Sequence, residues 1–449
     1  MYSLPESLEL IRKDFLRKTK NLLSKETTMS KKIWIIIFLF TSISSAYSQN
    51  GASLGLRGMT AISRGVDAVY WNPANLARKE AGDKNFQLIL YSFNFGLGNN
   101  AFSYKSIEKY IGDGESIYLT ENDKNDILDL IKTDGLRFDA AATGSVLSWS
   151  YKNFGFGIET TSFADISIPR DVYKNILFEF GNDSYDYSVK GSGYVLGKYK
   201  LSYGRTLITD IMVSMAPLGD IIFDEINVGA SLSYLRGYGY AGIEDGVATL
   251  DINDNGILPV VDLSAKKAEK GRGMGLDLGL GLKTRNGYLF AAVVENVFAR
   301  VHWYAGTEIT TAIMDFGNQP LFILGEGQLA DIDIDSVSTD TTVAIGSFNS
   351  TIPVNFRFAL AKQINKFTLN LEFARENKYY GTSLGCMVDL GVLKLLGSLS
   401  QAHENVVWGG AFAVDFPGFY IDLGASSRNG LTLANTRGIF YGTAMKIRF

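Results

Sequence analysis

One stretch of the chain has the residue types and spacing of a calcium-binding loop. It follows the pattern D-x-N-x-N-G-x5-D. In EF-hand-like loops, positions 1, 3, 5 and 12 supply oxygen ligands, position 7 supplies a carbonyl, and glycine at position 6 permits the sharp turn. The predicted ligands are Asp251, Asn253, Asn255, the Ile257 carbonyl and Asp262. Two neutral amides, an internal proline and the lack of evident flanking helices leave a polar Asx-turn in solvent as the alternative. Calcium would stiffen the loop and would have no catalytic role, and we expect no cofactor to be required.

The chain offers little for enzymatic chemistry. Its two histidines are His302, within an aromatic cluster, and His403, within a turn-like segment, and no G-x-S-x-G nucleophile motif is evident. We expect both histidines to be structural or solvated, and the protein not to be an enzyme. The single Cys386 excludes an intrachain disulfide. A formal net charge of −4 provides no basic surface for nucleic acid.

The N-terminal region is typical of a secretory signal peptide. A basic pair and an apolar run occupy 31–40, and 46–48 (AYS) suits a signal peptidase. We therefore predict a signal peptide at 29–48, preceded by a non-native upstream extension at 1–28. The alternative is a genuine helical segment followed by an anchor. The apolar run, however, is shorter than the ~20 residues that a spanning helix needs.

The C-terminal residues Gly438–Phe449 (GIFYGTAMKIRF) read as a membrane β-strand. One face is mostly apolar and the other ends in two cations, as expected for a strand with lipid on one side and a wet lumen on the other. The apolar face includes Tyr441, Met445, Ile447 and Phe449. A terminal aromatic on such a strand resembles the signal that outer-membrane barrels present to their assembly machinery.

Short alternating runs of this kind recur along the whole chain. We predict about fourteen strands, and the clearest hairpins are Asn355–Arg375 and Gly273–Phe298. In the second hairpin, Asn286-Gly287 predicts a type I′ turn with positive φ at both residues. Abundant glycine (47) and 12% aromatic residues suit curved strands with aromatic girdles. The predicted fold class is an all-β transmembrane antiparallel barrel, and the alternative is a secreted soluble β-sandwich or propeller.

Three segments do not read as strands. Glu121–Thr133 predicts a short amphipathic helix in a loop. Ile208–Phe223 is apolar but interrupted by a proline, and Leu321–Ser347 is acidic. We expect these insertions to be extracellular, because barrel loops are long on one side and short on the other.

Residues 55–77 (GLRGMTAISRGVDAVYWNPANLA) resemble the N-terminal region of FadL-type outer-membrane transporters and of the related PorV-like barrels of a protein secretion system. The family's glycine after Asn-Pro-Ala is Asn75 here, and its glycine-rich start is only partly kept. The matching positions are Gly55, Gly58, Asp67, Ala68, Tyr70, Trp71, Asn72, Pro73, Ala74 and Leu76.

This resemblance implies a 14-stranded barrel at 85–449 with an N-terminal hatch at 49–84 inside it. Its implied function is passive uptake of hydrophobic small molecules across the bacterial outer membrane. The gating residues would be Asp67, Tyr70, Trp71, Asn72, Pro73 and Ala74. The alternatives are a cap that only stabilises the barrel, and a PorV-like accessory barrel of a secretion or surface-attachment complex. The implied partners are outer-membrane lipid, the barrel-assembly machinery, and either a hydrophobic ligand or a secretion-system protein.

Overall fold

The computed structural model describes residues 50–78, 84–110, 119–178, 185–215, 219–253, 256–315, 322–323, 328–329, 338–376, 379–402 and 405–449. The predicted upstream extension, the signal peptide, His403 and residues 321, 324–327 and 330–337 of the acidic segment lie outside these residues.

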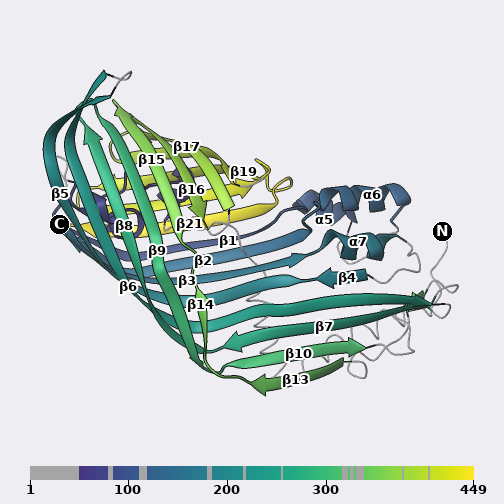
Figure 1. The fold of residues 1–449 in the computed structure, drawn as a ribbon. Coiled ribbons are helices and arrows are strands. Elements are labelled where there is room, and N and C mark those ends of the chain that lie inside the picture. Colours follow the sequence, from purple (N-terminus) through teal and green to yellow (C-terminus); the bar gives the residue numbers. More distant parts are fainter. Residues whose placement is uncertain are drawn as a thin grey trace.

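Fourteen described strands form a closed antiparallel barrel, as predicted (Figure 1). Each strand pairs with the next around the wall, and the last pairs with the first. In order around the wall the strands are β1 (Phe86–Asn99), β2 (Leu136–Tyr151), β3 (Phe154–Ile168), β5 (Lys190–Met215), β6 (Gly219–Asn253), β8 (Lys270–Thr284), β9 (Tyr288–Ala305), β15 (Asn355–Ile364), β16 (Phe367–Glu376), β17 (Tyr379–Asp389), β18 (Leu393–Ala402), β19 (Asn405–Phe416), β20 (Phe419–Arg428) and β21 (Gly438–Arg448).

The seam between β1 and β21 closes the barrel with the terminal residue of the chain. Phe449 and Phe86 exchange backbone hydrogen bonds of 2.9 and 3.2 Å, and their ring centroids lie 5.9 Å apart. Closure leaves no unpaired sheet edge in the wall itself, which a membrane barrel requires because lipid cannot hydrogen-bond to backbone groups.

The two ends of the barrel differ. At the short-turn end, which also holds Phe449, brief turns join β2 to β3, β8 to β9, β15 to β16 and β19 to β20. The turn after β8 is not the predicted type I′ turn: Gly287 has a φ of 84°, but Asn286 does not have a positive φ. The Gly287 N–H donates to the Thr284 carbonyl at 3.0 Å, so the loop is longer, with glycine alone in the left-handed region.

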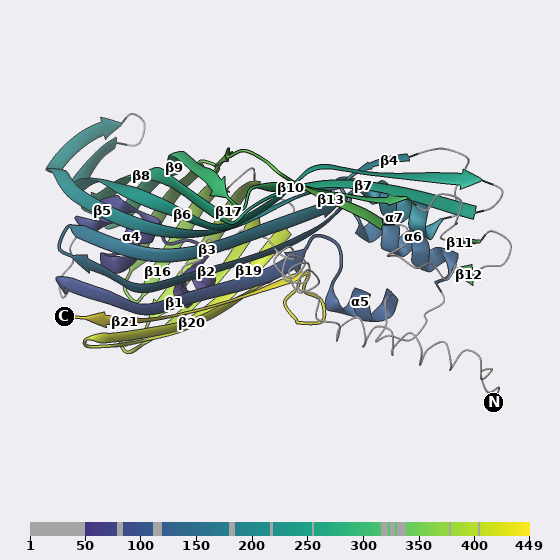
Figure 2. The same cartoon turned by 90° about the horizontal axis from the view of Figure 1, so that it is seen from below.

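The opposite, long-loop end carries additional structure (Figures 1 and 2). Helices α5 (Tyr104–Tyr110), α6 (Glu121–Leu130) and α7 (Arg170–Leu177) lie there, and α6 is the predicted amphipathic helix. A sheet extension also projects from β6. It contains β4 (Tyr185–Ser188), β7 (Gly256–Ala268), β10 (Glu308–Asp315) and β13 (Ser338–Ala344), while β14 (Phe348–Thr351) pairs with β9. The two-residue strands β11 (Phe322–Ile323) and β12 (Gln328–Leu329) complete it.

The prediction for Ile208–Phe223 is wrong. Strands β5 and β6 continue through most of this segment as a long hairpin that projects from the short-turn end (Figure 1). Its alternation is interrupted where the register shifts between Thr206 and Ile208, and Asp210 has a φ of 55°. Such irregularities break the period-two pattern on which strand prediction depends.

Side chains on the wall alternate between lipid-facing and lumen-facing positions. On β21, Tyr441 is exposed, whereas Phe440, Ala444 and Lys446 are buried inside. This confirms the predicted division of the terminal strand into an apolar outer face and an inner face with cations. Within the described part of the chain, no helix is both long and apolar enough to cross a bilayer.

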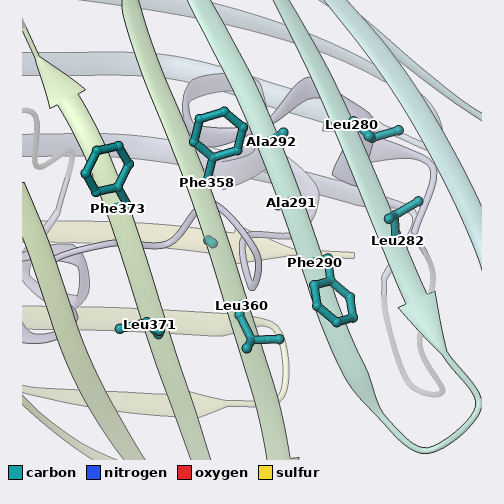
Figure 3. A pocket seen from close by; sticks show the side chains of 10 residues that line it. Leu280, Leu282, Phe290, Ala291, Ala292, Phe358, Leu360, Leu371 and Phe373 are labelled. Carbon is teal, nitrogen blue, oxygen red and sulfur yellow. The ribbon is translucent and has the colours of Figure 1, made fainter. Parts of the chain in front are cut away.

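Outward-facing side chains on β8, β9, β15 and β16 surround a hollow of about 420 Å³ on the outer wall (Figure 3). Large apolar side chains border it, and Ala292 lies among them.

Candidate functional site: a hatch inside the lumen

Residues 50–78 lie inside the barrel, as predicted, and none of them is exposed. They form α3 (Gly51–Leu56), η1 (Gly65–Asp67), α4 (Ala68–Trp71) and η2 (Pro73–Leu76). Helix α3 contacts β17 to β21, and η2 contacts β5, β6 and β8 on another part of the wall. The hatch therefore bridges the lumen rather than lying along one side.

Helix α3 begins and ends at residues suited to those positions. Asn50 and Ser53 form a reciprocal capping box, and Arg57 ends the helix with a left-handed φ of 53°. A Cβ atom added at Gly51 would lie 2.4 Å from the backbone nitrogen of Gly424 on β20. Glycine at this position allows the helix backbone to touch the wall directly.

The Asn-Pro-Ala segment is fixed to the opposite part of the wall by the side chain of Asn72. Its Oδ1 accepts a 3.1 Å hydrogen bond from the Ala74 N–H, and its Nδ2 donates a 3.0 Å bond to the Leu280 carbonyl on β8. Asn72 has an extended φ of −160°, as expected before proline. Pro73 then starts η2, where a missing N–H costs nothing.

Asn75, which lies where the FadL-type sequences that this segment resembles have glycine, links two parts of the hatch. Its Nδ2 donates to the Thr60 carbonyl at 3.0 Å and to Ser63 Oγ at 3.2 Å. Arg78 ties the same turn together by donating to the Ala61 and Ile62 carbonyls at 2.5 and 3.0 Å. Sequence reasoning did not identify Asn75 or Arg78 as functional, because their partners lie more than ten residues away.

Tyr70 and Trp71 fill the lumen, and both side chains are buried. The Tyr70 hydroxyl is hydrogen-bonded to Ser148 on β2, and burial raises the pKa of this phenol. The phenol therefore stays neutral. Trp71 Nε1, in contrast, has no hydrogen-bond partner among the described residues. Its ring instead lies 4.8 Å from the Arg357 guanidinium, a cation–π distance.

A buried charge network lies on the wall beside these two aromatic residues. Arg357 pairs with Glu295 at 3.0 Å, and Lys200 pairs with Asp277 at 2.7 Å. All four side chains are at least 90% buried. Buried charges of this kind need partners, and the pairing confines Arg357 to a position over Trp71.

Asp67 connects the hatch to the terminal strand. Its Oδ2 accepts a 2.7 Å bond from Lys446 Nζ, and its Oδ1 accepts a 3.2 Å bond from Asn50 Nδ2. Lys446 is 2% exposed. Asp422 on β20 adds a further contact by accepting a 2.7 Å bond from the Gly51 N–H. Glu372 on β16 accepts a 3.1 Å bond from the Thr60 N–H.

Below the hatch, a cavity of about 630 Å³ opens toward the short-turn end. Leu56, Met59 and Ile62 of the hatch form its apolar side, and Lys394 and Arg448 are among its charged residues. The hatch thus separates this cavity from the lumen on its other side.

The predicted calcium ligands do not form a compact loop in the backbone. Asp251 and Asn253 lie at the end of β6, Ile257 and Asp262 lie on β7, and Asn255 is outside the described residues. Asp251 pairs with Leu258, so Asp262 lies four positions farther along β7, or about 13 Å at strand spacing. Calcium binding remains a prediction for this hairpin.

His302 is the histidine that lies among the described residues, and it has a polar contact within the sheet. His302 Nδ1 lies 3.1 Å from Asn349 Oδ1, in an exposed contact between β9 and β14. No nucleophile accompanies this pair in the contacts of the described residues.

Residues 77–260 match a family model described as a family of unknown function, DUF5723. No curated protein matches the sequence.

The fold is similar to several solved structures. The monoaromatic hydrocarbon channel CymD is 10% identical, with 90% of this chain and 98% of that chain covered and a TM-score of 0.48. The toluene transporter TbuX of Ralstonia pickettii is 12% identical, with 90% and 100% covered and a TM-score of 0.45. A FadL homologue of Pseudomonas aeruginosa is 10% identical, with 91% and 100% covered and a TM-score of 0.45.

Proposed function

We propose that the protein is an outer-membrane barrel that mediates passive uptake of hydrophobic small molecules. One observation carries the proposal: residues 50–78 are buried across the lumen of a closed barrel. A 14-stranded barrel without such a segment would have room for an aqueous channel. With the hatch in place, a solute must pass around or displace it.

A closed barrel of this kind suits apolar substrates. Their transfer from water into an apolar environment is favourable without energy input. The hatch core includes Val66, Val69 and Leu76 as well as the two aromatic residues. Tyr70, Trp71 and Asn72–Ala74 form the gate, because their contacts reach β2, β15 and β8.

The orientation follows from the two ends of the barrel. In outer-membrane barrels, short turns face the periplasm and long loops face outward. The cavity below the hatch then opens to the periplasm, and α5, α6 and α7 lie outside the cell. The predicted signal peptide at 29–48 and the aromatic Phe449 on the last strand support export and barrel assembly.

A reversible cross-link tests the gate. A Cβ atom added at Gly281 on β8 would lie 3.8 Å from the Ala74 Cβ, close to the mean separation in disulfides. In a Cys386→Ser background, Ala74→Cys with Gly281→Cys should allow the hatch to be locked by oxidation. We expect uptake of a labelled monoaromatic or alkyl probe into vesicles to stop on oxidation and return on reduction.

The two single-cysteine variants are the matched controls and should be insensitive to oxidant. Transport at an unchanged rate through a barrel that mass spectrometry shows to be fully cross-linked would refute gating by this segment.

The sheet extension supports a second candidate, an accessory barrel that docks onto a secretion or surface-attachment complex. Strands β7, β10 and β13 extend the wall beyond the barrel at the long-loop end, where a partner could bind without entering the lumen. A large protein should then copurify at a fixed ratio and be lost when 308–344 is replaced by a short linker. Retained binding by that variant would exclude the extension as the docking surface.

A further inference from the structure

The hollow on the outer wall has a simple origin in the strand register. One outward-facing row consists of Leu280, Ala292, Phe358 and Phe373, which are register partners on adjacent strands. The next row toward the short-turn end contains four large residues, Leu282, Phe290, Leu360 and Leu371. Alanine is the one small side chain in these two rows, and the hollow of about 420 Å³ between the large side chains includes the space over it (Figure 3).

A lysine, Lys362, lies on the outer face of β15 on the short-turn side of this gap. The next outward-facing position on β9 is Tyr288, and its register partner on β15 is Lys362. Lys362 Nζ lies 3.9 Å from the centroid of the Tyr288 ring. Two residues along a strand span about 7 Å, so the ammonium group lies one outward position beyond Leu360 toward the short-turn end.

The wall behind the gap is sealed. Ala291 and Ala359 point inward and are buried, and they pack with Ala61 of the hatch. The hollow therefore does not lead into the lumen and is not part of the uptake route. It faces the bilayer, where the surrounding molecules are lipids and water is absent.

We propose that this hollow is a binding site for one phospholipid of the leaflet at the short-turn end. An acyl chain fills the gap over Ala292, between Phe358 and Leu280. The headgroup phosphate pairs with Lys362, and Tyr288 lies at the interface between the two, as amphipathic aromatic residues do. This site is independent of the uptake proposed above.

The occupant follows from shape and charge together. A dry gap loses the dispersion contacts that its lining atoms would otherwise make, and an acyl chain restores them. The Lys362 ammonium group lies near one end of the apolar gap. This arrangement matches a phospholipid, in which a negatively charged phosphate lies at one end of the acyl chains. An anionic phospholipid should bind more tightly than a zwitterionic one, in which a second headgroup charge opposes the phosphate.

The test is native mass spectrometry of the full-length processed protein, delipidated and then titrated with phosphatidylglycerol or phosphatidylcholine. Ala292→Phe fills the gap, and Val294→Phe is its matched control at the next outward position of the same strand. Lys362→Gln removes the cation, and Lys152→Gln is its control, because Lys152 lies over Tyr151 on another part of the same rim. Folding of each variant is checked by heat-modifiable migration on gels.

We expect one tightly retained phosphatidylglycerol, with at least tenfold weaker binding in Ala292→Phe and an unchanged affinity in Val294→Phe. Lys362→Gln should reduce the preference for phosphatidylglycerol at least fivefold, and Lys152→Gln should not. Equal binding by Ala292→Phe and the unchanged protein would overturn the site, and equal preference in the two lysine variants would overturn the role of Lys362.

If Ala292→Phe does not fold, thermal melts of the unchanged protein and of Lys362→Gln test the site in a second way. A lipid that binds only the folded state raises the midpoint temperature of unfolding, and the rise grows with the logarithm of the lipid concentration. Phosphatidylglycerol should raise the midpoint in the unchanged protein more than in Lys362→Gln. The same shift in both would refute the proposal.

Discussion

The ion pair between Asp67 and Lys446 offers the most direct test of how the hatch is held. Lys446→Met removes the ammonium group that lies 2.7 Å from the Asp67 carboxylate. The Asp67 side chain is 15% exposed, and it keeps the hydrogen bond that it accepts from Asn50. Removing one member of a buried pair typically costs 3–5 kcal/mol, and we take the low end, about 3 kcal/mol, because Asp67 is partly accessible. At ~1.4 kcal/mol per tenfold change, the population of the opened hatch should rise about a hundredfold.

Hydrogen exchange followed by mass spectrometry measures this population for each peptide. We expect exchange to rise in peptides covering 64–72 and to stay unchanged in β16 and β18, which do not contact Lys446. Asp67→Asn combined with Lys446→Met is the matched control, because replacing both charges removes the unpaired carboxylate. The double variant should recover most of the protection. Equal exchange in the single and double variants would show that the charge pair does not hold the hatch.

Four further predictions concern other parts of the chain. Asn72→Ala should destabilise the closed hatch by about 1–2 kcal/mol, because a cap and a wall contact are lost, and exchange at 72–76 measures this; an unchanged rate would contradict the role of the amide. Deleting Phe449 should lower the yield of heat-modifiable barrel in outer membranes, and a normal yield would exclude it as an assembly signal. Calcium should protect 251–262 from proteolysis, and Asp251→Ala should abolish that protection; equal cleavage with calcium and with chelator would remove the site. Hydrogen bonds from Thr120 hold the pKa of Asp123 below its usual range, so order in α6 should persist above about pH 4 and decline as the pH falls further; exchange at 121–130 that does not vary with pH would refute this.

Much of the wall could be predicted from local sequence. Strands such as Asn355–Ile364 and Phe367–Glu376 match the predicted hairpin closely. The reason is that a wall between lipid and a polar lumen requires apolar and polar side chains to alternate along each strand. This alternation can be recognised in a short segment of sequence. The prediction failed where a strand was bulged, as at 205–223, because a bulge breaks the alternation.

The hatch was predicted from the resemblance of residues 55–77 to FadL-type and PorV-like barrels, but its contacts were not. Asp67 and Lys446 were both identified, one as a gating residue and one as an inward cation on the terminal strand. Nothing local to either residue indicates that they meet. They are 379 residues apart in sequence, and they come together only when β21 closes on β1.

The segment that enters the lumen was predicted from its resemblance to a known family. The sequence itself determined the class of fold, the positions of many wall strands and the lipid-facing side of the terminal strand. These properties depend on alternation, turn residues and proline, which act over a few positions. Only the tertiary structure decided which wall residues hold the hatch, how the charges in the lumen pair, and that a hollow on the outer wall includes the space over Ala292. Each of these depends on the register between strands, and register in a closed barrel is fixed by all the strands together.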